Sequence, residues 1–123
     1  MKKTRPPLGD LEHELLQILW QHGEMTATAV RNQVARKLKD PTIRTVLRRL
    51  EEKGYVTHAV VSGTFVYRAS DSAETAAASA VQGIVDRFCG GSIERALLGL
   101  ADAGMIDANQ LSAIAGKLKR RSR

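Results

Sequence analysis

Hydrophobic residues in the early part of the chain recur at the spacing of two α-helices. The first predicted helix is capped by Asp10 and ends near Gly23, and its apolar residues lie on two sides, so we expect both sides to be covered. The second is capped by Thr26, with Val30 and Val34 on its inner side and basic residues on its outer side. Two short amphipathic helices therefore precede the stretch KDPTIRTVLRRLEEKGYV.

This stretch, residues 39–56, predicts a third helix with two chemically different sides. Asp40 and Pro41 form a strong start, because a carboxylate accepts from free amide groups and proline loses no hydrogen bond in the first turn. Gly54 is expected to end the helix. The aliphatic residues fall within an arc of about 100°, opposite a polar side. The aliphatic set is Ile43, Val46, Leu47 and Leu50, and the polar set is Thr42, Arg44, Thr45, Arg48 and Arg49.

Two segments rich in β-branched and aromatic residues follow Gly54. YVTHAVV and TFVYRA flank Ser62-Gly63, and this pattern predicts a hairpin with a tight turn. Three helices followed by a hairpin is the order of a winged helix-turn-helix domain, which we assign to residues 1–69. The predicted fold class is therefore mainly α with a small β-hairpin.

Residues 70–123 predict three further helices, each with one apolar stripe. Asp71 begins a sequence that resembles a capping box, Gly90-Gly91 ends the first of these helices, and Ser92 and Asp107 can cap the other two. Three stripes in so short a region leave too little partner surface within one chain, so we expect a helical dimerisation region and a homodimer. The residues expected in the dimer interface are Val81, Ile84, Val85, Phe88, Leu97, Leu100, Leu111, Ile114 and Leu118.

Charge is distributed unevenly along the chain, whose net charge is +6. Residues 1–69 hold 12 Lys/Arg and 7 Asp/Glu, residues 70–116 hold 2 and 6, and residues 117–123 hold five basic residues and no acidic one. A basic first segment favours an anionic partner, and two Tyr, two Phe and one Trp offer little for stacking on unpaired bases, so duplex DNA is favoured. We interpret the basic ends, MKKTR and KLKRRSR, as solvated termini, with an arm that reaches the DNA backbone as the alternative for MKKTR.

A charged helix side is usually only solvated, but the order of elements and the basic first segment favour DNA contact here. The guanidinium fork of arginine can pair with guanine or grip phosphate, and threonine suits phosphate or the thymine methyl. We therefore expect Thr42, Arg44, Thr45 and Arg48 to contact double-stranded DNA. Arg49 lies on the same side but could instead pair with an acidic residue at the end of the helix.

The residues indicate neither enzyme nor metal chemistry. His13, His22 and His58 show no ligand spacing, and no nucleophile elbow, phosphate loop or HExxH motif is present. The single Cys89 cannot form an intramolecular disulfide or a cysteine-cluster metal site. No apolar run approaches the roughly 20 residues of a membrane span, and MKKTRPPLGD lacks the apolar stretch of a signal peptide. We expect a cytoplasmic protein that needs no cofactor and is not inserted in the membrane.

Three stretches of the chain, the last followed by a Tyr-containing strand, are LGDLEHELLQILW, TATAVRNQV and PTIRTVLRRLEEKGYV. Together they resemble the penicillinase repressors of bacteria, the BlaI/MecI family. The resemblance covers most of the chain, the winged-helix part closely and the tail through its helix pattern and the Gly90-Gly91 break. TIRTxLxRLxxKG is fairly specific to that family. The resemblance implies a homodimer that binds an inverted-repeat operator and blocks transcription of antibiotic-resistance or stress genes.

The resemblance also implies relief of repression by proteolysis in the tail, triggered by a membrane sensor protease system. The best-known relatives are cleaved at an Asn-Phe bond, and the corresponding pair here is Gly99-Leu100. The wing, HAVVSGTFVYRA, departs from the family because its tip lacks Arg or Lys, which leaves His58 and Arg68 as the nearby cations; Arg68 joins the expected DNA contacts. The alternatives are a ligand-sensing winged-helix regulator relieved by a small molecule and an interaction module that does not bind DNA.

Overall fold

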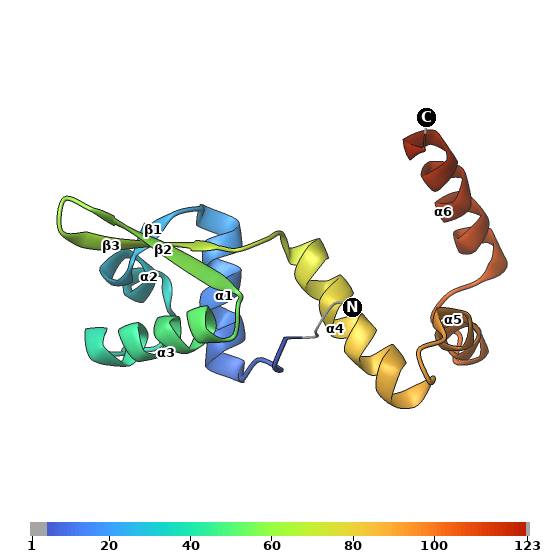
Figure 1. The fold of residues 1–123 in the computed structure, drawn as a ribbon, viewed down its shortest axis with the longest axis horizontal. Helices are drawn as coiled ribbons and strands as arrows, with labels where there is room; N and C mark the ends of the chain where they lie inside the picture. Colours follow the sequence, from blue (N-terminus) through green and yellow to red (C-terminus); the bar gives the residue numbers. More distant parts are fainter. Residues whose placement is uncertain (1–4, 123) are drawn as a thin grey trace. The chain divides into compact units, whose positions relative to one another are not determined.

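The computed structural model describes residues 5–122, and within them the chain forms six helices and a three-stranded antiparallel sheet (Figure 1). The backbone contacts divide the chain into two units, the first running to Val81 and the second starting at Gln82. This division falls inside helix α4 (Ala73–Phe88), whereas the sequence placed a boundary after residue 69. The first half of α4 therefore belongs with the winged-helix elements.

Three helices build the core of the first unit. They are α1 (Asp10–His22), α2 (Ala27–Gln33) and α3 (Asp40–Glu52). Leu15 and Leu16 point to different sides of α1, and both are completely buried, which confirms that α1 is covered on two sides. The other buried side chains of this core are Ile18, Leu19, Ala27, Val30, Val34, Ile43, Val46, Leu47, Leu50, Tyr55, Val56, Tyr67 and Ala76.

The sheet has the strand order β1-β3-β2, so β3 is its central strand. Its strands are β1 (Met25–Thr26), β2 (Val56–Val61) and β3 (Thr64–Ala69). β1 pairs Met25 with Tyr67 and Thr26 with Val66. The sequence did not predict β1, because two residues are too few to show the alternation that identifies a strand.

The predicted hairpin between β2 and β3 is confirmed. Ser62 and Gly63 connect the strands, and both have positive φ angles, 51° and 78°. Two consecutive positive φ angles are typical of the turn whose twist matches that of the strands. Gly54, at φ 87°, ends α3 as predicted and directs the chain into the hairpin.

Two helices of the first unit start differently from the prediction. Gly9 caps α1 in place of Asp10, and its N–H donates to the Glu12 carboxylate at 2.7 Å. Lys39 occupies the cap position of α3, and the Asp40 carboxylate makes no capping hydrogen bond. Asp40 instead lies 2.9 Å from the Arg31 guanidinium of α2, because an opposite charge competes with the helix amides for its oxygen. The predicted cap at Thr26 is confirmed by its acceptance of the Ala29 N–H.

Helix α4 also has a different cap. Ser72 Oγ accepts the N–H of Thr75 at 3.1 Å, so Ser72 performs the role predicted for Asp71. Asp71 is instead engaged by Arg5 and Trp20, two residues distant in the sequence. Local spacing predicted a cap within one residue of the observed one, but it could not reveal these long-range partners.

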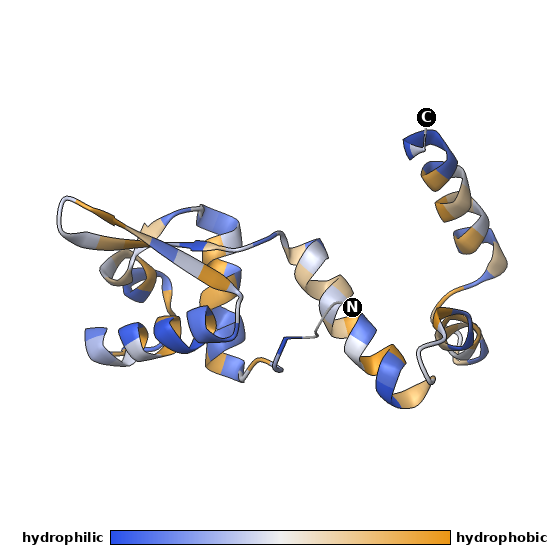
Figure 2. Cartoon of the chain, viewed as in Figure 1, coloured by the Kyte–Doolittle hydropathy of each residue, from blue (hydrophilic) through white to orange (hydrophobic). Residues whose placement is uncertain are grey.

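The second unit contains the end of α4 with α5 (Ile93–Asp102) and α6 (Ala108–Arg121). Gly90 and Gly91 end α4 with positive φ angles, as predicted. Ser92 caps α5, and Asp107 forms a reciprocal capping box with Gln110, also as predicted. Figure 2 shows hydrophobic segments along α5 and α6, and a hydrophilic last turn of α6. No helix between residues 5 and 122 combines the length and apolar character that a membrane crossing needs.

Candidate nucleic-acid interface

Helix α3 separates an anchored aliphatic side from an exposed polar side. Ile43, Leu47 and Leu50 are completely buried. Thr42, Arg44, Arg48 and Arg49 are exposed, and Thr45 is half-buried. The Thr45 hydroxyl donates to the Pro41 carbonyl at 2.9 Å, so only its lone pairs are available to another group. The helix is therefore held by one side while the other presents guanidinium groups.

An open groove of about 790 Å³ runs between α3, the start of α2 and the hairpin. Arg44 and Arg48 line it from α3, and Phe65 and Tyr67 line it from β3. Its other lining residues are Thr26, Ala27, Thr28, Glu51, Glu52, His58, Gly63 and Thr64. The structure thus brings Arg44 and Arg48 together in one concave surface with residues that sequence reasoning did not select.

The groove is electrostatically uneven. Arg44 and Arg48 supply positive charge, whereas Glu51 and Glu52 supply negative charge further along the same helix. Burial and the Glu51 charge raise the pKa of Tyr67 above its ordinary value of 10.0, and the Arg44 charge partly opposes them. Tyr67 therefore presents a neutral hydroxyl at neutral pH. An anion is attracted beside the arginines and repelled beside the carboxylates, which favours one placement of a phosphate backbone.

His58 connects the hairpin to the end of α3. Its Nδ1 lies 2.7 Å and 2.9 Å from the two carboxylate oxygens of Glu51, and its ring stacks on Phe65 with centroids 4.1 Å apart. The sequence assigned no partner to His58, because Glu51 belongs to a helix and His58 to a strand, and local spacing does not relate residues of different elements. This contact fixes the base of the hairpin against the helix that carries Arg44 and Arg48.

The remaining expected DNA contacts lie outside the groove. Arg68 is exposed on β3, and its Nε donates to Thr57 Oγ1 at 3.3 Å. Thr42, Thr45 and Arg49 are not among the groove-lining residues. The charge of Arg49 acts on Glu12 of α1, where it is one of the causes that lower the pKa of the carboxyl. The hairpin tip is apolar, with Val60, Val61 and Phe65 exposed.

Seven of the nine residues expected at a dimer interface are exposed, whereas Leu111 is half-buried and Val85 is buried. Val85 is only 1% exposed and is buried within its own chain, so it is not available to a second copy. Three exposed side chains that the sequence did not select, Ile93, Leu98 and Met105, extend the apolar surface. Helical spacing identified the apolar stripes, but it does not show which residue of a stripe is buried within the same chain.

The Gly99-Leu100 pair lies inside α5 (Ile93–Asp102). A protease needs an extended and accessible backbone, so cleavage there would require local unfolding of this helix. Between residues 5 and 122, no group of three or more His, Cys, Asp or Glu side chains is placed to hold a metal ion.

The fold and the groove define a class: a winged helix-turn-helix protein whose third helix presents a basic side. Over residues 8–120 the chain matches the penicillinase repressor family, and it belongs to that family. It is 24% identical to the penicillinase repressor of Bacillus licheniformis over 116 residues, which cover 93% of this chain and 90% of that repressor.

Two solved structures are similar to this chain. The DNA-binding domain of the repressor BlaI is 29% identical and matches with a TM-score of 0.51, over 59% of this chain and 90% of that domain. The YusO protein of Bacillus subtilis is 15% identical with a TM-score of 0.51, over 92% of this chain and 75% of YusO, and shares the fold. The winged-helix prediction is confirmed, and the chain is a DNA-binding transcriptional repressor rather than an enzyme.

Proposed function

We propose that this repressor acts in the cytoplasm as a homodimer on an inverted-repeat operator, and that Arg44 and Arg48 of α3 are its principal DNA contacts. The observation that carries this proposal is the placement of the two guanidinium groups. They lie one helical turn apart on the exposed side of α3 and line the same groove, while Leu47 on the opposite side is completely buried. A rigid helix with two neighbouring arginines can enter the major groove of duplex DNA.

The two arginines have the chemistry for both parts of operator recognition. A guanidinium can donate two parallel hydrogen bonds to guanine O6 and N7, or it can grip a phosphate. Thr42, exposed two residues before Arg44, offers a hydroxyl and a methyl group to phosphate or thymine. The hairpin tip, by contrast, is apolar and has no positive charge to pair with phosphate. We therefore propose that α3 supplies most of the salt-dependent affinity for DNA.

The apolar surface of the second unit supports the homodimer. Between residues 82 and 122, Val85 is the only buried side chain, and most large hydrophobic side chains there are exposed. Such a region cannot be stabilised by its own burial, and a second copy related by a two-fold axis would cover it. We propose that the interface consists of Val81, Ile84, Phe88, Ile93, Leu97, Leu98, Leu100, Met105, Leu111, Ile114 and Leu118. Two-fold symmetry in the protein matches an inverted repeat in the DNA.

We further propose that proteolysis in α5 would relieve repression. A cut at Gly99-Leu100 would separate α6 from the winged-helix unit and remove part of the apolar surface. A sensor protease that recognised this site would therefore weaken the dimer and, with it, the paired engagement of two half-sites.

The proposal is tested with DNA fragments of the source genome that the wild-type protein retains, which yield the operator, followed by binding measurements with Arg48→Ala. Loss of one bidentate contact per half-site costs about 1–3 kcal/mol, so we expect affinity for the operator to fall at least about tenfold. The dimer mass in sedimentation should be unchanged. Arg36→Ala is the matched control, because Arg36 is an exposed arginine of the same unit that is not among the groove-lining residues. Unaltered operator binding by Arg48→Ala would reject the assignment of α3.

A further inference from the structure

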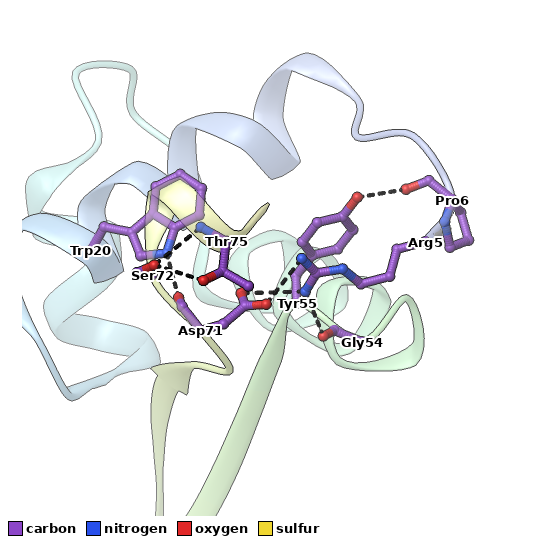
Figure 3. Close-up of polar contacts among 8 residues, drawn as sticks. All are labelled: Arg5, Pro6, Trp20, Gly54, Tyr55, Asp71, Ser72 and Thr75. Atoms are coloured by element: carbon purple, nitrogen blue, oxygen red, sulfur yellow. Dashed lines mark hydrogen bonds and ion pairs between the residues drawn. The ribbon is translucent and has the colours of Figure 1, made fainter. Parts of the chain in front are cut away.

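Arg5 joins two parts of the chain that are distant in the sequence (Figure 3). Its Nη1 donates to the Gly54 carbonyl at 3.1 Å and to Asp71 Oδ1 at 3.3 Å, and its Nη2 lies 3.1 Å from Asp71 Oδ2. The guanidinium carbon lies 4.2 Å from the centroid of the Tyr55 ring. One side chain thus holds both the residues that follow α3 and the residue that precedes α4 by two positions. The sequence was interpreted to make MKKTR a solvated terminus, but Arg5, its last residue, is mostly covered and engaged by other residues.

The segment that carries Arg5 is itself fixed along the end of α3. The Tyr55 hydroxyl donates to the Pro6 carbonyl at 2.9 Å, and Lys53 Nζ donates to the Pro7 carbonyl at 3.0 Å. Lys53 also contacts the buried Glu12 carboxylate at 2.7 Å. The Arg5 side chain is only 17% exposed, and Asp71 is 27% exposed, so solvent screens this ion pair less than it screens a surface pair.

Two further hydrogen bonds hold the residues just before α4 to the first unit. Trp20 Nε1 donates to the Asp71 carbonyl at 2.9 Å, and the Ser70 N–H donates to the Tyr55 carbonyl at 2.9 Å (Figure 3 shows the Trp20 contact). Ala76, in the first turns of α4, is buried in the core of the first unit. Specific contacts therefore fix the start of α4 to the first unit, and among them the side chain of Arg5 holds both Gly54, after α3, and Asp71, before α4.

We propose that Arg5 is a positioning residue that sets the separation of the two half-sites in the operator. This inference rests on the proposed homodimer, in which α4 connects each DNA-reading unit to the dimer region. A helix of 16 residues is about 24 Å long, so a tilt of about 10° at its start displaces its far end by about 4 Å. That displacement is close to the rise of one base pair, about 3.4 Å. Loosening the clamp of Arg5 and Asp71 therefore alters spacing selectivity and leaves half-site recognition unchanged.

The test is selection of bound duplexes from a random DNA library by full-length wild-type and variant proteins, followed by sequencing. The wild type is expected to select paired half-sites at one separation. Arg5→Ala is expected to select the same half-site sequence over a range of separations. Linking two half-site contacts raises affinity by about 10²- to 10⁴-fold, and we expect Arg5→Ala to lose about tenfold of this gain on the operator selected by the wild type. Its affinity for a single half-site should stay within about twofold of the wild-type value.

Two further variants separate positioning from folding. Asp71→Asn keeps an acceptor but removes the charge, and Arg5→Lys keeps the charge but cannot hold Gly54 and Asp71 together with one ammonium group. Both are expected to broaden the spacing, and they decide the outcome if circular dichroism shows that Arg5→Ala does not fold. Arg36→Ala is the control, because it breaks another arginine–carboxylate pair, with Glu14, within the same unit. It should retain one separation.

The outcomes distinguish this inference from the proposed function. A single unchanged separation in all three clamp variants would overturn the inference, and so would a change of half-site sequence without a change of separation. If the wild-type protein selects only unpaired half-sites, the proposed homodimer on an inverted repeat fails, and the positioning role of Arg5 fails with it.

Discussion

The two units of this protein bury their hydrophobic residues in opposite ways. In the first unit, α1, α2, α3 and the sheet enclose a core with Leu15, Leu16 and Leu47 completely buried. In the second unit, Val85 is buried, but Phe88 is 74% exposed and Met105 is 69% exposed. The surface that we propose to contact DNA thus has a geometry that one chain fixes for itself. Placing two such surfaces depends, in our proposal, on contacts that only a second chain can supply.

The largest effect is expected from a change in the first core. Leu47→Ala removes a completely buried side chain behind Arg44 and Arg48 and should lower the free energy of unfolding by about 2–5 kcal/mol. Urea unfolding, followed by circular dichroism, measures this loss. Val60→Ala is the control, because Val60 is 60% exposed on the hairpin and lies outside the proposed interface, so truncation there should cost well under half as much. Equal losses in the two variants would contradict the contribution of the buried core to the stability of the first unit.

A charge in the second unit should affect association rather than folding. Phe88→Asp removes a large apolar side chain from the proposed interface, worth about 1.5–3 kcal/mol of burial, so the dimer dissociation constant should rise at least about tenfold. Sedimentation measures the dissociation constant, and circular dichroism checks that helix content is unchanged. Ala113→Asp adds the same charge to α6 on the side away from Leu111 and Leu118, and it should leave the dimer intact. A monomeric wild-type protein at micromolar concentration would contradict the dimer directly.

The smallest effect concerns acid stability of the first unit. Burial raises the pKa of Glu12, but the Gly9 N–H, Lys53 and Arg49 together lower it by more, so the pKa lies below 4.5. The resulting stabilisation is complete above the unfolded-state pKa and is lost as pH falls through the folded-state pKa. Glu12→Gln should therefore cost about 1 kcal/mol at neutral pH and flatten the decline of stability in acid. Denaturant titrations from neutral to acid pH test this, with Glu24→Gln as an exposed control. An unchanged acid profile in Glu12→Gln would contradict it.

Features set by neighbouring residues were predictable from the sequence. The two sides of α3, the Ser62-Gly63 turn, and the caps at Thr26, Ser92 and Asp107 all follow from spacing or from the conformational preferences of single residues. Prediction was weaker where a residue had several partners to choose from. Asp40 and Asp71 were assigned to helix amides, but each forms an ion pair with an arginine outside the helix that it was expected to cap.

Contacts between distant residues carried no signal in the sequence. Arg5 and Asp71 are 66 positions apart, and no periodic pattern relates them. The same holds for His58, whose partner Glu51 belongs to a helix and whose own place is in a strand. The sequence predicted that Arg44 and Arg48 share the polar side of α3, and both are exposed there. The groove that they line also needs the hairpin and α2, whose approach is decided by tertiary packing.

The short strand β1 has a consequence for the motion of the hairpin. β1 pairs with Val66 and Tyr67 only, so the sheet has three strands at the middle of the hairpin and two from Val60 and Phe65 to the turn. A two-stranded ribbon without a covered face opens at a lower free energy than a three-stranded sheet. Amide protons near the turn therefore exchange with solvent before those of Val66 and Tyr67 opposite β1. In our proposal of DNA binding, the tip can then follow the local contour of a duplex while the three-stranded part stays fixed.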